Sequence, residues 1–233
     1  MPRKPRSSTF KKPALPVSTS ASSPSSVPAP TPSEGLLFPT HLDFENWLEE
    51  NQAKATAGTW ILISKKANPD PTTHTLTYDQ AVDSALCFGW IDGQRRSIPD
   101  ASTSRNITGS THFAQRFTPR RGASLWSKRN VDKITAFFAQ TPCPIRPAGM
   151  AQIQAAKDDG RWERAYAGPK DMLVPPDLEE AIRTKGGTAD VVFEGLNRSQ
   201  RYPLLHKIET AKKPETRKKR IEQIVEMLSE GKF

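Results

Sequence analysis

The sequence predicts an α+β fold in which a small antiparallel sheet packs with helices and is followed by an all-helical C-terminal part. Three observations support this prediction. Short strand-like runs alternate with amphipathic helical patterns over residues 36–170, only helical patterns follow from residue 171 on, and a Pro- and Ser-rich leader precedes both. We therefore expect a disordered basic leader over residues 1–35, an α+β core over 36–170 and a helical subdomain over 171–233.

The positive charge of the chain is concentrated at its two ends. The 233 residues carry a net charge of +9. Residues 1–33 hold five basic and no acidic residues, residues 34–200 hold 20 of each, and residues 201–233 hold nine basic and five acidic residues. The central region therefore lacks the excess of cations that is typical of a broad phosphate-binding surface.

The leader is too rich in Pro and Ser to bury much apolar surface, and we expect it to be disordered. It is a solvated tail, a nuclear-import or nucleic-acid-binding arm, or a mitochondrial presequence, since it is basic, rich in Ser and free of acidic residues. Its prolines disfavour the presequence, because they would break an amphipathic helix.

The expected location is the cytoplasm, with the nucleus as an alternative and the mitochondrion as a less favoured one. Two cysteines and no secretory signal favour a reducing compartment. No apolar run approaches the roughly 18–20 residues of a membrane span, so none is expected.

The elements of the core follow from periodicity and from start and stop signals. Thr77 and Gln80 form a predicted capping box at the start of one helix, and Gly89 is its predicted stop. Ser127 is the predicted cap of a later helix. The expected helices are 41–52, 77–88, 127–140 and 148–158, and the expected strands are 60–63, 90–98 and 111–118.

Alternation along the two later strands predicts which side chains share a face. Residues 90, 92, 94 and 96 should share one face of their strand. In the next strand Phe113, Gln115 and Phe117 should share a face, with Arg116 on the other. After residue 175 the patterns predict helices over 177–184, 188–196, 199–211 and 215–230.

Several runs resemble the YdeI/OmpD-associated family, also called bacteriocin-protection proteins. They are TYDQAVDSALCFGWIDG from residue 77, RFTPRR from 116, SLWSKRN from 124, PAGM from 147, GRWERAY from 160, PPDLEEAI from 175 and AKKPETRKKRIEQIVEML from 211. The resemblance covers about residues 36–231. It implies a stress or protection protein, and it supplies neither a reaction nor catalytic residues.

The first runs contain the candidate site, a pocket lined by Trp90, Asp92, Arg116, Arg120 and Trp126. Arginine offers a planar fork of donors to a carboxylate or phosphate, and the two tryptophans supply apolar walls. The expected ligand is a small anion or an acidic segment of a protein partner, bound without catalysis. One alternative is a structural salt bridge among core tryptophans, and another is an enzyme of unknown reaction centred on Asp92 and Arg116.

A second cluster of cations opens the last predicted helix. Cations at a helix N-terminus oppose the helix dipole, so a polyanion contact would explain them, and a solvated face is the plainer alternative. Nucleic acid is a less favoured partner than a small anion, because the central region has no basic excess. The cluster comprises Lys212, Lys213, Arg217, Lys218, Lys219 and Arg220.

Other classes of chemistry find little support in the sequence. It contains no GxxxxGK[ST] loop, GxGxxG fingerprint or GxSxG elbow. The four histidines do not stand at metal-ligand spacing, and Cys87 lies in an apolar helical run. Asp79 and Asp83 stand at i and i+4, where an exposed helix face is expected. We therefore expect neither a cofactor nor a metal.

Overall fold

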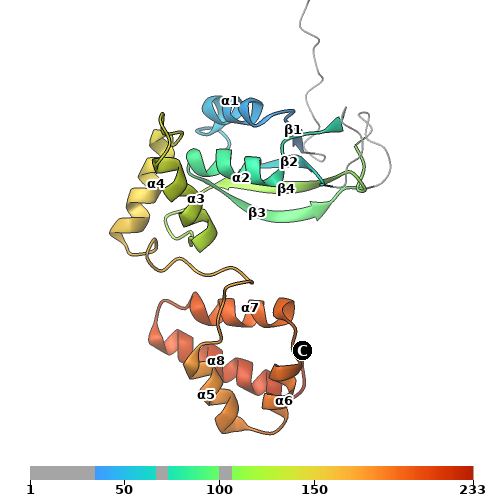
Figure 1. Ribbon diagram of the computed structural model, residues 1–233, viewed down its shortest axis with the longest axis vertical. Coiled ribbons are helices and arrows are strands. Elements are labelled where there is room, and N and C mark those ends of the chain that lie inside the picture. Colours follow the sequence, from blue (N-terminus) through green and yellow to red (C-terminus); the bar gives the residue numbers. More distant parts are fainter. Residues whose placement is uncertain (1–34, 67–72, 100–106, 233) are drawn as a thin grey trace, which may run out of the picture.

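The computed structural model describes residues 35–66, 73–99 and 107–232, and they form an α+β part followed by four helices (Figure 1). The predicted fold class is confirmed. The predicted leader falls on residues 1–34 apart from its last residue, the buried Gly35, and two further gaps cover residues 67–72 and 100–106. These lie outside the described residues.

A four-stranded sheet forms the centre of the α+β part. Its strand order is β1-β2-β4-β3, with β2 and β3 each antiparallel to β4. β1 runs parallel to β2, so the sheet is mixed. The strands are β1 (Leu36–Leu37), β2 (Thr59–Ser64), β3 (Trp90–Ser97) and β4 (His112–Pro119).

A β-bulge in β3 changes the predicted alternation of side chains. Asp92 pairs with Phe117 and Arg95 pairs with Gln115, so the register shifts between Asp92 and Arg95. Arg95 therefore follows Asp92 on the face that the helices cover. The expectation that Arg96 shares this face is wrong, because the inserted residue moves Arg96 to the opposite one.

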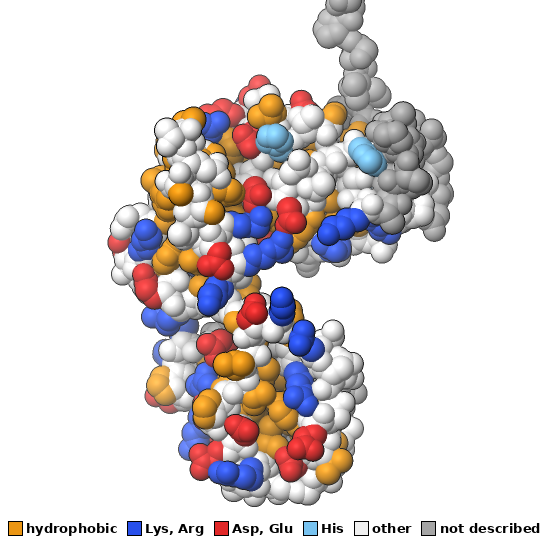
Figure 2. Space-filling view, in the orientation of Figure 1, with side chains coloured by type: hydrophobic (Ala, Val, Ile, Leu, Met, Phe, Trp, Pro, Cys, Tyr) orange, Lys and Arg blue, Asp and Glu red, His pale blue; other side chains and the backbone are white. Residues whose placement is uncertain are grey.

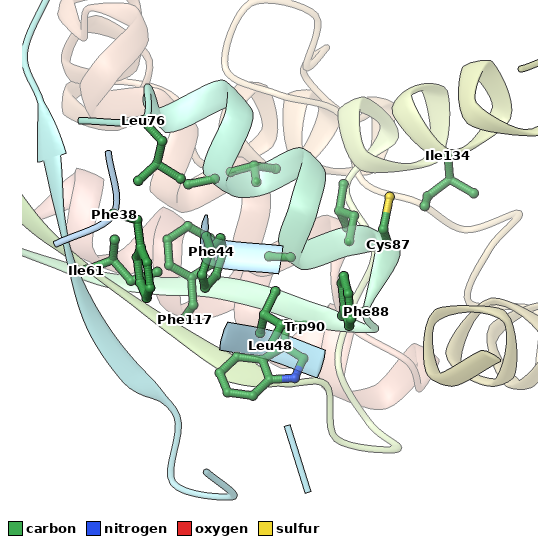
Figure 3. Packing of buried hydrophobic residues seen from close by; sticks show 14 of the residues in the cluster. Phe38, Phe44, Leu48, Ile61, Leu76, Cys87, Phe88, Trp90, Phe117 and Ile134 are labelled. Carbon is green, nitrogen blue, oxygen red and sulfur yellow. The ribbon is translucent and has the colours of Figure 1, made fainter. Parts of the chain in front are cut away.

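Two helices cover one face of the sheet, and both begin with a capping box. These are α1 (His41–Asn51), capped by Thr40, and α2 (Tyr78–Cys87), capped by Thr77 as predicted. Phe44 of α1 packs on Phe117 of β4, with ring centroids 5.8 Å apart. The core between these layers is dominated by aromatic and branched side chains (Figure 3).

The next two helices pack at the end of α2 (Figure 1). They are α3 (Lys128–Phe138), capped by Ser127 as predicted, and α4 (Pro147–Asp158). Gly89 ends the preceding turn with φ of 74°, the left-handed region that favours glycine. Gly149 lets α4 approach α2 closely, because a Cβ there would lie 2.3 Å from the Cys87 carbonyl oxygen.

Four further helices form a separate hydrophobic cluster, which we call the helical lobe. They are α5 (Pro176–Lys185), α6 (Thr188–Gly195), α7 (Arg198–Glu209) and α8 (Pro214–Ser229). The preceding described residues, 35–166, form the N-terminal lobe (Figure 1). The edge of the Tyr166 ring packs against His206 of α7, with centroids 4.6 Å apart, where the lobes meet.

Candidate functional site

The five residues of the predicted pocket do not all lie together. Arg116 pairs with Trp60 across β2 and β4, whereas its neighbour Phe117 pairs with Asp92 across β3 and β4. Successive residues of a strand point to opposite faces, so Arg116 and Asp92 lie on opposite sides of the sheet. The Arg116 Nη2 atom donates to the carbonyl of Ala57, 2.8 Å away.

The sequence-predicted Trp90 is part of the core. Its side chain is buried, and its ring meets the Trp47 ring edge-on with centroids 6.1 Å apart. Trp90 therefore belongs to the hydrophobic core. Of the five predicted residues, Asp92, Arg120 and Trp126 remain as candidates for a binding site.

Arg120 and Trp126 form a stacked, buried pair just beyond the end of β4. The Arg120 Cζ atom lies 3.6 Å from the centroid of the Trp126 ring, and Arg120 is only 6% exposed. Arg120 Nη1 donates to the Leu125 carbonyl at 3.1 Å. Within the described part of the chain, Arg120 Nε, Arg120 Nη2 and Trp126 Nε1 are buried and have no acceptor. The pair thus presents three unused donors.

Burial without an ion pair makes Arg120 an electrostatically costly cation. Desolvation lowers the pKa of Arg120 to about 10, while the charges of Tyr166 and Asp92 act in the opposite direction. No ion pair joins Arg120 to any carboxylate among residues 35–66, 73–99 and 107–232. Arg120 remains a cation at neutral pH and lacks a close counter-charge there.

A small cavity lies where the two lobes meet, and its lining includes Leu125, whose carbonyl accepts from Arg120, but neither Arg120 nor Trp126. Its volume is about 40 Å³, and Leu125, Arg161 and Tyr166 line it together with the end of α7. Buried Arg161 donates to both oxygens of Asp159 and to the Ser124 carbonyl, so its charge is compensated. The space exceeds the roughly 10–15 Å³ that one water requires. It has the size of a small ion.

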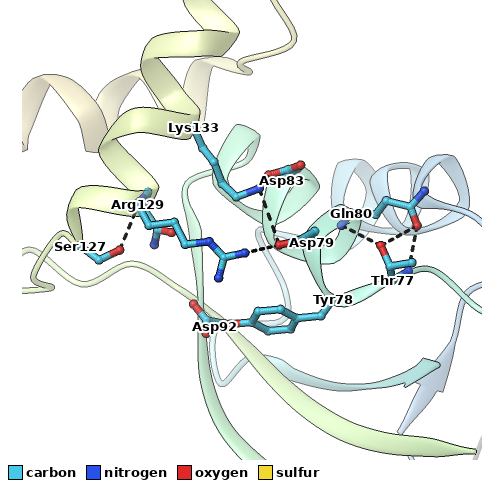
Figure 4. A network of polar contacts seen from close by, with 10 residues as sticks. Thr77, Tyr78, Asp79, Gln80, Asp83, Asp92, Ser127, Arg129 and Lys133 are labelled. Carbon is cyan, nitrogen blue, oxygen red and sulfur yellow. Dashed lines mark hydrogen bonds and ion pairs between the residues drawn. The ribbon is translucent and has the colours of Figure 1, made fainter. Parts of the chain in front are cut away.

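Asp92 is held by a tyrosine. Tyr78 Oη donates to Asp92 Oδ2 at 2.6 Å (Figure 4). Burial, and secondly this hydrogen bond, raise the pKa of Tyr78 above its ordinary value, so Tyr78 is a neutral donor at neutral pH. Asp92 is thereby fixed as an acceptor on the helix-covered face of the sheet.

The acidic pair of α2 lies at the surface, opposite cations of α3 (Figure 4). Asp79 pairs with Arg129, and Lys133 Nζ lies 2.6 Å from Asp83 and 3.9 Å from Asp79. These pairs link α2 to α3. Asp79 is exposed as expected from the sequence, whereas Asp83 is half-buried.

Arg95 is a residue that sequence reasoning missed. Its guanidinium lies over the Phe113 ring, 4.0 Å from the centroid, and its Nε donates to Gln115 Oε1 at 3.2 Å. Gln115 is only 2% exposed, and its amide also donates to the carbonyls of Gly93 and Gln94 in the bulge. A glycine inside a strand pattern can signal such a bulge, and Gly93 is the glycine that gives this signal in β3.

The basic cluster before and within α8 is partly committed to the helical lobe. Arg217 binds Asp177 through two nitrogen atoms, at 2.6 and 2.9 Å, and Arg220 donates to the Lys207 carbonyl. The remaining members, Lys212, Lys213, Lys218 and Lys219, are exposed on the helical lobe. They form the free part of the predicted polyanion contact.

The part of the chain that the structure describes shows no activated cysteine, no metal site and no membrane-spanning helix. Burial raises the pKa of the Cys87 thiol to about 12, which keeps it protonated, and Cys143 is a free, exposed thiol. The described residues include no group of three or more His, Cys, Asp or Glu that could hold a metal ion. None of their helices is long and apolar enough to cross a membrane.

Comparison with known families divides the chain in two. Residues 36–152, just over half of the chain, match a family model described as a domain of unknown function (DUF8412). Residues 171–231 match a model described as Bacteriocin-protection, YdeI or OmpD-Associated. The resemblance seen in the sequence is thus confirmed over the helical lobe, whereas the predicted pocket lies in or near the first match. No curated protein and no solved structure matches the chain.

Proposed function

The chain belongs to the DUF8412 family and carries a YdeI/OmpD-associated, bacteriocin-protection domain, and we propose that it is a non-catalytic protection protein that binds a small anion at Arg120. The proposed site keeps Asp92, Arg120 and Trp126 from the predicted pocket and adds Tyr166. Arg116 is not part of it.

The observation that carries this proposal is the set of three buried donors on the Arg120–Trp126 pair. A buried donor without a partner costs about 1–3 kcal/mol, and a buried charge costs more. A small anion would accept hydrogen bonds from these donors and supply the missing counter-charge. The cavity of about 40 Å³ is lined by Leu125 and Tyr166 rather than by Arg120 or Trp126, so the proposal requires the anion to reach the three donors from that side.

An enzyme centred on Asp92 and Arg116 is a weaker candidate. The two residues lie on opposite faces of the sheet, and a reaction centre requires its groups within hydrogen-bonding reach of one substrate. Cys87 and Tyr78 also hold their protons tightly, so neither is an activated nucleophile.

The test compares the full chain with Arg120→Met and with Arg121→Met, a matched control at the neighbouring exposed arginine. Thermal unfolding is followed in phosphate, sulfate and acetate at constant ionic strength. A bound anion at about 100 times its Kd stabilises by about 2.7 kcal/mol, which corresponds to roughly 5 °C or more in a chain of this size. Arg121→Met should keep this rise and Arg120→Met should lose it.

Native mass spectrometry of the same three proteins supplies an independent readout. We expect an adduct of fixed mass on the parent and on Arg121→Met, and none on Arg120→Met. An equal thermal response and an equal adduct in all three proteins would remove Arg120 from the proposed function. The loss of folding in Arg120→Met is detected separately by its far-UV circular dichroism.

A further inference from the structure

A large cavity lies in the N-terminal lobe, apart from Arg120. Its volume is about 570 Å³, and it lies between the end of β2, the start of α2, the middle of β3 and the start of β4. Lys65, Lys66 and Arg95 supply its cations, and Tyr78 and Phe113 supply its aromatic surface. Ligand pockets in proteins commonly measure about 300–1,000 Å³, so this space suits a small organic molecule. We call it the Arg95 groove.

The fold holds Arg95 in one orientation. The bulge turns Arg95 to the helix-covered face of the sheet. Gln115 accepts a hydrogen bond from its Nε, and its guanidinium lies over the Phe113 ring. The Tyr78 ring centroid lies 5.2 Å from the same guanidinium. Gln115 is itself buried and fixed by the bulge carbonyls. A binding residue is preorganised when buried polar groups fix its side chain by hydrogen bonds, and Gln115 does this for the exposed Arg95.

The electrostatic setting of the groove is positive. Its acidic lining residue, Asp79, is already paired with Arg129 and approached by Lys133. Lys65 donates to the Gly109 carbonyl, and Lys66 is exposed. The N-terminus of α2 adds the positive end of a helix dipole. Figure 2 shows Lys and Arg side chains gathered along the margin of the N-terminal lobe that faces the helical lobe.

We propose that the Arg95 groove binds a nucleoside phosphate, with the base stacked on the Arg95 guanidinium and the phosphate held by Lys65 and Lys66. Arginine guanidinium groups and aromatic side chains are the groups on which proteins stack nucleic-acid bases, and the Arg95 guanidinium lies between 4.0 and 5.2 Å from the centroids of two aromatic rings, Phe113 and Tyr78. A bare phosphate would use the lysines alone and would make no use of the Arg95 guanidinium and the Tyr78 ring. The proposal uses none of the residues 67–72 that follow Lys66.

This proposal is independent of the Arg120 site. Arg120 lies beyond the end of β4 and is absent from the lining of the Arg95 groove. Arg120→Met should therefore bind a nucleotide as the parent chain does. The source of the nucleoside phosphate is a free nucleotide or a segment of single-stranded nucleic acid, and both share the same chemistry of base and phosphate.

The neighbouring arginines of β3 provide a matched pair of variants. Arg95 lies over Phe113, and Arg96 lies over Trp60 on the opposite face, 4.3 Å from the ring centroid. Isothermal titration of the full chain with AMP, adenosine, inorganic phosphate and a single-stranded DNA 10-mer is repeated with Arg95→Ala, Arg96→Ala, Lys66→Ala and Arg120→Met. Far-UV circular dichroism verifies that each variant is folded.

The parent chain should bind AMP more tightly than adenosine, and Arg120→Met, which lacks the proposed anion site, should bind AMP more tightly than inorganic phosphate. Arg95→Ala should weaken AMP binding by roughly tenfold or more, and Arg96→Ala should leave it within about twofold. Lys66→Ala should weaken AMP binding and spare adenosine binding, because only AMP carries the charge that it meets. Tighter binding of the DNA 10-mer that is also lost in Arg95→Ala would support the same groove and identify nucleic acid as its source.

Three results would overturn the proposal. They are the absence of AMP binding by the parent chain at millimolar concentration, equal AMP affinities in Arg95→Ala and Arg96→Ala, and binding of inorganic phosphate by Arg120→Met that is as tight as its binding of AMP. Binding of the DNA 10-mer that persists unchanged in Arg95→Ala would equally place the contact elsewhere, and the exposed lysines near α8 are the surface it would then implicate.

Discussion

Arg120 is placed where a cation weakens the folded state. It is buried, its charge has no ion-pair partner among the described carboxylates, and desolvation lowers its pKa. Residues kept in such settings are often required for function at the expense of stability. Stacking on Trp126 and the hydrogen bond to Leu125 offset part of the cost, and they also hold the guanidinium in place for a ligand.

Replacement of Arg120 by Met should therefore stabilise the chain in low-salt buffer. An apolar side chain of similar length removes the desolvated charge, and such replacements are often neutral or stabilising by about 1–4 kcal/mol. We expect a rise in Tm of about 2–4 °C, which corresponds to about 1 kcal/mol for a chain of this size. Calorimetry of the anion-free protein measures it.

The exposed neighbour supplies the reference for this measurement. Arg121→Met should change the free energy of unfolding by no more than about 0.5 kcal/mol, as is usual for surface substitutions. If Arg120→Met instead lowered the Tm by several degrees, Arg120 would be a structural cation whose hydrogen bond and stacking outweigh its desolvation.

The sequence could predict the members of this site only in part. Asp92, Arg120 and Trp126 stand out because charged and aromatic residues are dense in residues 90–126. The sequence wrongly places Arg116 in the same pocket. Whether Arg116 and Asp92 share a face depends on the pairing register of β3 with β4, and local sequence patterns do not specify that register. Tyr166 lies 40 residues beyond Trp126, and only tertiary packing brings it close.

At the scale of elements, the junction of α2 and α4 depends on one glycine. A Cβ at Gly149 would lie 2.3 Å from the Cys87 carbonyl oxygen and 3.2 Å from Ile145 Cγ2. The Arg146 amide also donates to that carbonyl at 2.9 Å. The first turn of α4 is thus fitted directly onto the last turn of α2, and the backbone there cannot move without breaking this contact.

Gly149→Ala should consequently destabilise the N-terminal lobe. The methyl group collides with backbone, and overpacking of this kind costs about 1–3 kcal/mol. The measurement is urea unfolding followed by tryptophan fluorescence. Gly122→Ala is the control, because a Cβ at Gly122 meets no atom within 4 Å, and it should be neutral or slightly stabilising. Equal midpoints for the two variants would show that α4 shifts without cost.

Helices were more predictable than the details of the sheet. The capping residues Thr77 and Ser127 and the turn at Gly89 are local signals, and each begins or ends an element as expected. β1 has only two residues, too few for a periodic pattern, so its parallel pairing with β2 was not foreseen. The bulge in β3 was missed because Gly93 alone does not say which residue is inserted.

At the scale of the whole molecule, the two largest of the three hydrophobic clusters imply two cooperative units. One cluster joins the sheet to α1, α2, α3 and α4, and the other lies wholly within residues 172–228. Ring packing of Tyr166 on His206 and the small cavity beside Arg161 mark where they meet. We therefore expect a domain boundary near residue 170, between the residues of the two clusters.

The distribution of tryptophan makes this division measurable. All five tryptophans lie between residues 47 and 162, so their fluorescence reports only the N-terminal lobe. Helical ellipticity reports both lobes, because α5, α6, α7 and α8 contribute to it. We expect the two signals to give different urea midpoints, since two domains that unfold separately violate two-state behaviour.

A pair of core substitutions distinguishes the two units further. Leu228→Ala, in the helical lobe, should cost about 2–5 kcal/mol there and should shift only the ellipticity transition. Leu48→Ala, equally buried in the N-terminal lobe, should shift the fluorescence transition. If both substitutions moved both signals together, the lobes would unfold as one unit, and the contact beside Arg120 would be strong enough to couple anion binding to the stability of the helical lobe.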